Sequence, residues 1–585
     1  MSSKSATTTA DAVDTVHAEN APPPPHHHHA PELVPIELEA VDNAIHINLS
    51  WRSWLVVFLT CFAIMAQVFV VVAAGSVIAF IVRDLGDASI SGWIIQGPLL
   101  MQSVLSPLVG RLSDVLDRKY LAAGPPLIAF VGAVISAKAT SMSMLIGGGV
   151  LIGTTLSTIA IVQAIPSEVL PLKYRALANG LAFLGGAVGG VVGSLGAGGV
   201  TNVSADGWRY IYWMQAAFHG ATSVGLFLFY WPAKRAPTGM TLRDYVWACD
   251  PIGSVLFVTS ATLMLLALDW AGGTYDWSDK HVAAPLAIGL ALLVLFGLYE
   301  WKGRSDGLIA HVFFQQNANF GLSVFAFAVE GWIFYSAVNA VVPQIVLNLG
   351  FETSSWKISI RQLSYTVVTM VASVPITLWA TYRKDLKGPL IVTFVVFFAV
   401  AVCYATLKTS WNHAQIGFSV LAGIGQSGPL TLLVACVQFT APHAYLSTAT
   451  GLAFSARAIG GAFGSAVLDA IINSHLKKNY ATKVGNAAVE AGLSPARVAE
   501  LLAAFTAGTT GDTSIATPDI WAAAITESRN VYAHAYRLAW ASVIPFVVLA
   551  TVAVACLRGV RELMTEKVEA TVEKVEAEVE KGVKE

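Results

Sequence analysis

The sequence contains fourteen apolar stretches, each long enough to cross a lipid bilayer. A spanning helix needs roughly 20 mostly apolar residues. Because the hydrocarbon core offers no water to bond the backbone, such stretches are expected to be helices. We therefore predict an all-α polytopic membrane protein with fourteen transmembrane helices. The predicted helices lie near 53–82, 91–109, 120–137, 142–165, 177–200, 209–231, 252–268, 282–300, 319–347, 358–380, 389–407, 414–438, 445–472 and 532–556.

The composition excludes several classes of protein. With 55% hydrophobic and 12% charged residues and a mean hydropathy of +0.63, the chain is too apolar for a soluble domain. A formal net charge of -2 leaves no basic face for nucleic acid. The five cysteines follow no CxxC or regular spacing, so no disulfide framework, metal site or cofactor is expected. The spans contain no Ser-His-Asp set or HExxH motif, which argues against an enzyme.

The predicted helices fall into groups of six, two and six, flanked by polar segments. The N-terminal segment is rich in Ala, Thr, Ser and Pro and is expected to be disordered. The predicted divisions are a cytoplasmic tail at 1–50, a six-helix bundle at 51–232, two linker helices at 233–310, a second six-helix bundle at 311–557 with a partly helical external loop at 473–531, and a charged cytoplasmic tail at 558–585.

The turn at residues 110–120 joins the second and third predicted helices and carries five charged residues. An Asp that closes an apolar helix, followed by Arg and Lys, can bind a helix end and a neighbouring helix. Basic residues favour the cytoplasmic side, and Lys and Arg are more frequent in the loops on the side of this turn. We predict a cytoplasmic latch in which Asp114 lies at a helix end while Arg118 and Lys119 bind the opposite bundle or anionic lipid. The alternative is an ordinary basic loop.

The residues Gly110, Asp114, Arg118 and Lys119 resemble the signature loop between spans 2 and 3 of the major facilitator superfamily. The family usually has a second Gly where this chain has Asp117. The resemblance implies a major facilitator fold, in which two six-helix bundles face each other across a central cavity. Alternating access would then arise from rocking of the two bundles.

Two ionisable residues lie deep inside predicted helices, where a charge costs several kcal/mol unless it faces a cavity or a partner. Glu330 lies near the middle of the helix at 319–347. Desolvation disfavours the charged form of such a carboxyl group, so Glu330 is a candidate for proton coupling or for binding a cationic substrate. Arg457 is the matching buried cation, followed by glycines that permit close helix contact. The alternatives are that Glu330 pairs with a polar neighbour and that Arg457 snorkels or pairs, in each case for packing alone.

Further polar side chains lie at membrane depth. His219 could titrate near neutral pH, although a lone histidine is more often a packing residue. Gln67 and Gln438, with other amides in the predicted helices, suit recognition of an uncharged, oxygen-rich solute. Glu330, Arg457, His219, Gln67 and Gln438 are therefore the candidate transport and coupling residues.

Several further motifs resemble the fourteen-span fungal trichothecene efflux pump family, which lies near the siderophore transporters and the drug:proton antiporters. They are the segments at 167–175 and 207–213, Asp250-Pro-Ile-Gly253, and Arg457 with its glycines. The resemblance implies a monomeric transporter in the plasma membrane or the vacuolar membrane. Many antiporters carry an Arg in span 4 and an Asp in span 1, where this chain has Gly149 and Gln67. Coupling would then rest on Glu330 or on a residue that the sequence does not identify.

These expectations combine into one functional hypothesis and two alternatives. We predict proton-coupled efflux of a toxin, drug or secondary metabolite, with protons and membrane lipid as further partners. The first alternative is a proton-coupled siderophore-iron importer, because the loop at 473–531 could hold a bulky chelate outside. The second is a sensor or membrane enzyme that transports nothing.

Overall fold

Long helices dominate the computed structural model, which describes residues 51–87, 90, 93–116, 118–170, 172–201, 206–231, 241–271, 275–315, 317–352, 355–507 and 511–564. These residues belong to one unit of the chain, residues 44–585. The expected N-terminal tail at 1–50 and most of the C-terminal tail lie outside the described residues, as does Asp117 of the latch motif.

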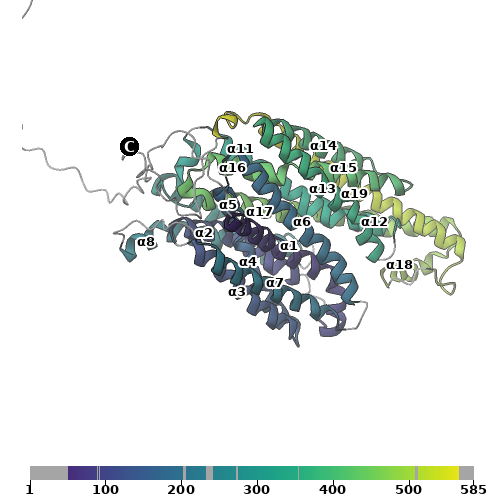
Figure 1. The fold of residues 1–585 in the computed structure, drawn as a ribbon. Helices are drawn as coiled ribbons and strands as arrows, with labels where there is room; N and C mark the ends of the chain where they lie inside the picture. The colour runs from purple at the N-terminus through teal and green to yellow at the C-terminus, as the bar shows by residue number, and fades with distance from the viewer. Residues whose placement is uncertain are drawn as a thin grey trace, which may run out of the picture. The chain divides into compact units, whose positions relative to one another are not determined.

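In the described residues, the N-terminal part of the chain forms seven α-helices (Figure 1). Their bounds are α1 (Trp51–Leu85), α2 (Trp93–Val115), α3 (Arg118–Ala137), α4 (Met142–Ser157), α5 (Ile159–Val169), α6 (Arg175–Thr201) and α7 (Trp208–Phe229). The predicted helix at 142–165 is divided at Thr158 into α4 and α5, and together these still make one apolar stretch.

The described residues of the predicted linker region form three α-helices and a short π-helix: α8 (Leu242–Ala248), α9 (Pro251–Trp270), α10 (Lys280–Leu298) and the π-helix η3 (Tyr299–Gly303). Asp250 caps α9 through its side chain, which accepts a hydrogen bond from the backbone N–H of Gly253, and Pro251 follows as the first helical residue. Asp250 has a φ of 49°, a left-handed conformation that Asp tolerates better than most residues. The chain therefore turns sharply between α8 and α9.

The remaining helices complete the C-terminal part. Their bounds are α11 (Asn319–Gly331), the π-helix η5 (Trp332–Val341), α12 (Val342–Asn348), α13 (Ser355–Arg383), α14 (Lys387–Ala405), α15 (Asn412–Gln426), α16 (Pro429–Thr440), α17 (Leu446–Glu490), α18 (Val498–Ala507) and α19 (Pro518–Ala555).

Twelve helical stretches in the described residues are long and apolar enough to cross a membrane. The helices α2 and α7 lie where two further spans are expected, with 23 and 22 residues, but are not among the twelve. Polar residues such as Gln102 in α2 and His219 in α7 lower their mean hydropathy. The all-helical membrane fold is therefore confirmed, whereas the count of fourteen spans stays a prediction.

The N-terminal helices pack closely on one another. The helix α1 contacts α6 and α7, and α3 contacts α4 and α7. A Cβ atom on Gly185 or Gly189 of α6 would collide with the backbone carbonyl oxygen of Cys61 or Met65 in α1. The glycine-rich sequence of α6 thus permits a backbone approach that larger residues would block.

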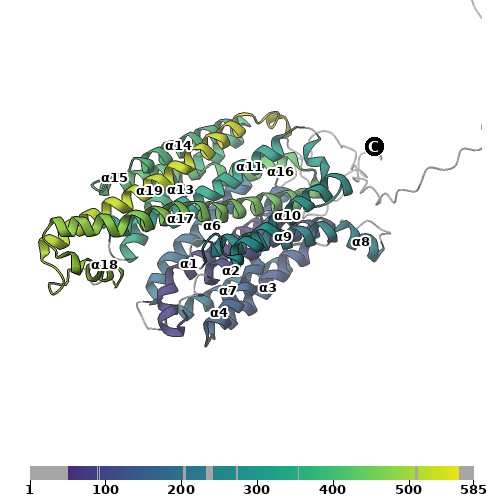
Figure 2. The same ribbon diagram turned by 180° about the vertical axis from the view of Figure 1, so that it is seen from behind.

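The N-terminal and C-terminal helices meet most extensively where α2 packs on α17 and α6 packs on α13. The helix α5 also contacts α17, and α6 also contacts α16. Gly110 of α2 faces the carbonyl group of Ser447, and Gly451 of α17 faces that of Ser106, so neither position has room for a Cβ atom. The linker helix α9 packs on α10 and also touches both α2 and α17. In Figure 2, α9 and α10 lie along this contact, which they cover from the outside.

The helices α17 and α19 continue well beyond the predicted spans. The expected external loop at 473–531 is largely helix, because α17 extends to Glu490 and α19 begins at Pro518. With α18 they enclose a small apolar core that includes Val484, Leu501 and Trp521. Figure 1 shows this extension, which comprises residues 473–531, at the opposite end from α8.

Candidate functional site

A buried ion pair joins α11 to α17. The carboxylate of Glu330 accepts a hydrogen bond from Nε of Arg457 at 2.5 Å and another from Nη2 at 3.0 Å. The Glu330 side chain is fully buried, and that of Arg457 is 6% exposed. The two residues are 127 positions apart in the sequence. The structure therefore brings together the two charges that the sequence places at membrane depth.

Polar and aromatic groups complete the surroundings of this pair. Gln426, at the end of α15, donates a hydrogen bond to Oε1 of Glu330. Nη1 of Arg457 donates to the hydroxyl oxygen of Tyr335 at 2.9 Å. The guanidinium carbon also lies 4.6 Å from the ring centroid of Phe334, within the range of a cation–π interaction. The guanidinium thus binds a carboxylate, a hydroxyl group and an aromatic face.

The close approach of α11 and α17 positions these groups. A Cβ atom on Gly331 would collide with the carbonyl oxygen of Arg457, and one on Gly460 with that of Ala328. The π-helix η5 begins directly after Gly331, and its wider turn sets the direction of Phe334 and Tyr335. The glycines that follow Arg457 in the sequence therefore do allow the close contact that their spacing predicts.

Burial makes the two charges interdependent. Each ion loses several kcal/mol of hydration, and mutual attraction with hydrogen bonds offsets that loss. Removal of one partner would leave the other charged and unpaired inside the protein. The pairing of Glu330 for packing and a role in coupling are compatible, because a pair that opens during transport would serve both roles.

Two other candidate residues lie among the N-terminal helices. The amide nitrogen of Gln67 donates to the carbonyl oxygen of Thr155 at 2.8 Å and to the hydroxyl group of Thr158 at 3.2 Å. His219 is buried in α7, and neither ring nitrogen has a hydrogen-bond partner among the described residues. Among the described residues, neither Gln67 nor His219 forms a hydrogen bond with Glu330 or Arg457. They do not form one site with the ion pair.

Gln438 contacts the N-terminal helices. Its side-chain oxygen accepts hydrogen bonds from Ser167 of α5 and Asn179 of α6, both at 2.9 Å. Its carbonyl oxygen accepts one from Arg175 at 2.8 Å. Gln438 therefore joins the two halves of the protein at the end of α16, close to the start of α17.

Asp114 makes the corresponding contact at the end of α2. Its carboxylate accepts hydrogen bonds from the backbone N–H groups of Ser447 and Thr448, at 3.1 and 2.7 Å, and from the Thr448 hydroxyl group at 2.8 Å. An anion at the first turn of a helix is favoured by the unpaired N–H groups and the helix dipole. The predicted position of Asp114 at a helix end agrees with this geometry, and the helix end is that of α17.

Arg118 differs from the expectation, whereas the expected binding of Lys119 to the opposite bundle or to anionic lipid stays a prediction. Arg118 forms ion pairs with Asp114, at 2.7 Å, and with Glu168 of α5, so it binds within its own half of the protein. Lys119 lies over the ring of Phe227 in α7. In the described contacts it is Asp114, rather than Arg118, that crosses to the other half. Arg118 begins α3 one turn after Asp114, and its side chain therefore folds back towards Asp114.

Several residues of these sites were not identified from the sequence. Gln426 and Tyr335 lie inside apolar stretches, and only their polar atoms at membrane depth could have indicated a role. Glu168 follows a predicted helix end and carries the only acidic side chain of the segment at 167–175. A single acidic residue in a loop that otherwise carries Lys173 and Arg175 is the pattern that could have identified Glu168 as an ion-pair partner.

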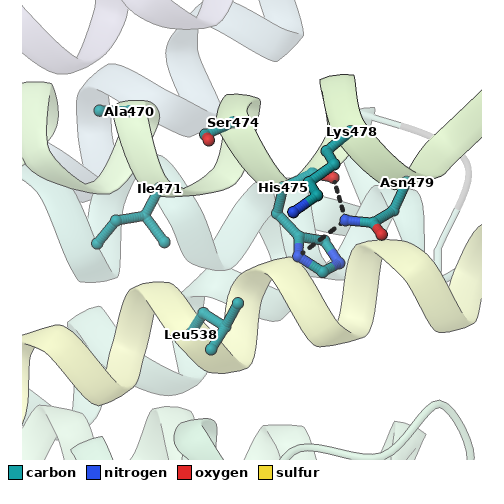
Figure 3. Close-up of a pocket in the computed structure, with 7 residues that line it drawn as sticks. All are labelled: Ala470, Ile471, Ser474, His475, Lys478, Asn479 and Leu538. Carbon is teal, nitrogen blue, oxygen red and sulfur yellow. Dashed lines mark hydrogen bonds between the residues drawn. The ribbon is translucent and has the colours of Figure 1, made fainter.

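Among the cavities in the part of the chain that the structure describes, two lie towards the helix ends farthest from Asp114. Figure 3 shows the larger one, of about 500 Å³, between α17 and α19. Ser474, His475, Lys478 and Asn479 supply its polar wall and Leu538 part of its apolar wall. The other, of about 340 Å³, is lined by residues that include Arg361. Both are separate from the Glu330–Arg457 pair.

Comparison with known proteins gives consistent matches. Residues 54–465 match the family described as Major Facilitator Superfamily. The MFS-type transporter ucsD of Acremonium sp is 26% identical over 438 residues, or 74% of this chain and 72% of that protein. The efflux pump FUS6 of Gibberella fujikuroi is 25% identical over 75% of this chain and 78% of its own length. The acurin A biosynthesis cluster MFS-type transporter of Aspergillus aculeatus is 27% identical over 67% and 70% of the two chains.

Proposed function

This chain belongs to the major facilitator superfamily, and we propose that it is a proton-coupled exporter of a small organic compound that works by alternating access. Membership makes it a multi-pass membrane transporter rather than an enzyme. The direction of transport, the coupling ion and the class of substrate are the parts that we propose. Names of similar proteins, an efflux pump and a biosynthesis-cluster transporter, support export of a toxin, drug or secondary metabolite.

The observation that carries this proposal is the position of Arg457 on α17. The same helix receives Asp114 at Thr448, nine residues earlier and about 14 Å away at the rise of an α-helix. A movement that separates α2 from the start of α17 must therefore also displace Arg457 relative to the rest of the protein. The link between a gate contact and a buried charge pair supports alternating access.

We place the Asp114 end of the helices in the cytosol. Contacts of Asp114 with Thr448 and of Gln438 with Ser167 and Asn179 join the two halves at this end. Such contacts favour a conformation that is closed to the cytosol. For export, they would open to admit the solute and then close again before its release on the other side. The membrane is the plasma membrane or the vacuolar membrane.

The substrate class follows from the surroundings of the ion pair. Arg457 neutralises Glu330, and the neighbouring groups are the Gln426 amide, the Tyr335 hydroxyl group and the ring of Phe334. Amide and hydroxyl groups recognise oxygen atoms, and aromatic faces bind planar apolar parts of a ligand. We propose an uncharged, oxygen-rich organic solute.

Import of an iron chelate is the second candidate function. The cavity between α17 and α19 is lined by Lys478 and His475 and by no carboxylate, which would suit an anionic chelate at the outer surface. A deletion strain separates the two functions. Increased sensitivity to drugs or toxins supports export, whereas failure to grow on chelated iron supports import.

Transport by the purified protein tests the proposal directly. Proteoliposomes are given a panel of labelled metabolites, with and without a pH gradient. We expect at least one uncharged solute to move faster with the gradient, and the Glu330→Gln variant to lose roughly tenfold or more of this rate, because about 1.4 kcal/mol corresponds to a factor of ten. Asp519→Asn, at an exposed position, is the control. Equal rates without a gradient would exclude proton coupling, and no movement of any solute would favour the sensor.

A further inference from the structure

The motif Asp250-Pro-Ile-Gly253 lies in a buried polar cluster that the transport site does not use. Asp250 is completely buried, and Glu300, at the end of the next membrane helix, is 3% exposed. Gly253 and Gly307 both lie against the two carboxyl groups. A Cβ atom on Gly253 would overlap with Oδ2 of Asp250 and would lie 2.6 Å from Oε1 of Glu300. One on Gly307 would lie 2.8 Å from Oε1 of Glu300 and 2.9 Å from Oδ2 of Asp250. The two oxygen atoms are therefore neighbours.

The two carboxyl groups differ in their hydrogen bonds. Asp250 accepts from the N–H of Gly253 at 3.1 Å, the hydroxyl group of Tyr299 at 3.2 Å and the N–H of Leu308 at 3.2 Å. Glu300 accepts at Oε2 from the N–H of Ile309 at 2.9 Å, whereas its Oε1 is buried and has no donor. Asp250 accepts every one of these hydrogen bonds, as an ionised carboxylate does. Oε1 of Glu300, which accepts none, is the oxygen atom that lies beside Oδ2 of Asp250.

The charges around this pair do not balance when every group is ionised. Arg304 lies 3.6 Å from Asp250 and 2.8 Å from Asp306, and Arg111 of α2 is also buried against this region. The Asp306 carboxylate is 37% exposed, so water screens its charge, whereas no cation lies within ion-pair distance of Glu300 among the described residues. Burial disfavours the charged form of Arg304, but the hydrogen bond to Asp306 and the charges of Asp306 and Asp250 outweigh burial and raise its pKa. Arg304 stays protonated beside Asp250, and an ionised Glu300 would have no cation of its own to offset its charge.

His311 does not pair with the carboxyl group of Glu300 in the described residues. Its Nε2 atom contacts the backbone carbonyl oxygen of Glu300 instead, at 2.9 Å. Two carboxyl groups that share a dry site cannot both ionise without a large repulsion. A proton on one of them removes this repulsion and gives Oε1 of Glu300 a partner.

We propose that Glu300 and Asp250 hold one shared proton, carried by Oε1 of Glu300 and donated to Oδ2 of Asp250, and that this proton site stabilises the closed cytoplasmic latch. The connection to the latch is Arg111. Its Nε donates to the carbonyl oxygen of Ala248 at 2.9 Å and its Nη2 to that of Asp306 at 2.8 Å.

The residues that carry these two carbonyl groups are close in sequence to residues that bind Asp250 or to Asp250 itself. Ala248 lies two residues before Asp250, and Asp306 lies two residues before Leu308, which binds Asp250. Arg111 follows Gly110 in α2 and precedes Asp114 by three residues. Loss of the proton would place two negative charges side by side and push apart the segments that hold Arg111. The latch would then open more readily as the cytosolic pH rises. The proton site itself does not rest on the proposed function, whereas its effect on transport does.

Infrared spectroscopy of the purified protein tests the proton site without any transported solute. A protonated carboxyl group has a C=O stretching band that a carboxylate lacks. We expect this band near neutral pH, and its loss from the spectrum of Glu300→Gln. The amide of Gln can donate to Oδ2 of Asp250 as the protonated acid does, so the variant should fold. Asp276→Asn, exposed between α9 and α10, is the matched control and should keep the band.

A second variant keeps the proposal testable if Glu300→Gln fails to fold. Asn tolerates the left-handed conformation of residue 250. Asp250→Asn removes the like charge beside Glu300, so the band should disappear at a lower pH than in the parent protein. An unchanged band in both variants between about pH 5 and pH 9 would overturn the shared proton.

The effect on the latch is measured by transport. The rate should fall as cytosolic pH rises in the parent protein, because a weakened latch slows each return to the closed state, and the rate of Glu300→Gln should not change with cytosolic pH. If the infrared result holds but the variant keeps the parent pH profile, the link to the latch is wrong and the proton site stands. If the parent protein transports nothing, the proposed function fails and the infrared result is unaffected.

Discussion

Asp114 accepts hydrogen bonds at one carboxylate oxygen from both the backbone N–H and the hydroxyl group of Thr448, at 2.7 and 2.8 Å. These residues are 334 positions apart, and they join the end of α2 to the first turn of α17. A sequence motif near the start of the chain therefore caps a helix near its end. Alternating access requires contacts of this kind to break and form again in each cycle.

Replacement of Asp114 by Asn should slow transport more than it reduces insertion into the membrane. Hydrogen bonds to a charged group contribute about 1.5–3 kcal/mol, and Asn can accept at only one of its two side-chain positions. We expect a fall in rate of roughly tenfold or more, measured as initial rate per inserted molecule in proteoliposomes. Asp519→Asn removes a charge at an exposed position and should transport normally. A parent-like rate in Asp114→Asn would refute the latch role.

Replacement of Glu330 by Gln should destabilise the protein, because Arg457 would remain charged and buried. The loss of one partner of a buried pair costs about 3–5 kcal/mol. The double variant Glu330→Gln with Arg457→Met should lose less stability than Glu330→Gln alone, since no unpaired charge remains. Thermal unfolding in detergent, followed by tryptophan fluorescence, gives the comparison. A double variant that loses the sum of both single effects would contradict direct pairing.

Replacement of Gly460 by Ala should destabilise the contact between α11 and α17. The new methyl group would collide with the carbonyl oxygen of Ala328, and such overpacking costs about 1–3 kcal/mol. Gly417→Ala provides a matched control in α15, because no atom lies within 4 Å of the added Cβ. There the higher helix propensity of Ala should raise stability by about 0.5–1 kcal/mol. The prediction fails if both variants shift the unfolding temperature in the same direction.

Replacement of Leu501 by Ala should loosen the extension at 473–531 and leave the ion pair intact. Leu501 is fully buried in the small core of α17, α18 and α19, and a Leu→Ala change in a core costs about 2–5 kcal/mol. Amide hydrogen exchange should increase in residues 484–524 and stay unchanged in α11. Equal increases in both regions would indicate one cooperative unit and contradict a separate core.

The sequence allowed the type of fold and the individual charged residues to be predicted, because both depend on local patterns. Long apolar stretches indicate spanning helices, and a charge within such a stretch is conspicuous, as Glu330 and Arg457 are. Their pairing was not predictable, since α11 and α17 meet through a fold that brings distant positions together. Gln438 was expected near the solute, but its hydrogen bonds to Ser167 and Asn179 depend on where α16 ends against the N-terminal helices.

The bounds of α17 illustrate a different difficulty. Lys477, Lys478 and Asn479 end the apolar pattern, and hydropathy therefore placed a helix end near residue 472. The backbone continues as a helix to Glu490, because Ala and Val residues then pack against α18 and α19. Hydropathy identifies where a helix leaves the hydrocarbon core of the membrane, whereas packing determines the residue at which the helix ends.

The 45 residues of α17 form one uninterrupted helix, about 68 Å long at the usual rise per residue. This length is more than twice the thickness of a hydrocarbon core, roughly 30 Å. A rigid rod of this length amplifies rotation: a tilt of about 5° at Thr448 displaces its far end by roughly 6 Å. Small rearrangements at one membrane surface would thus become large displacements at the other, where a spectroscopic label on α18 could follow them in real time.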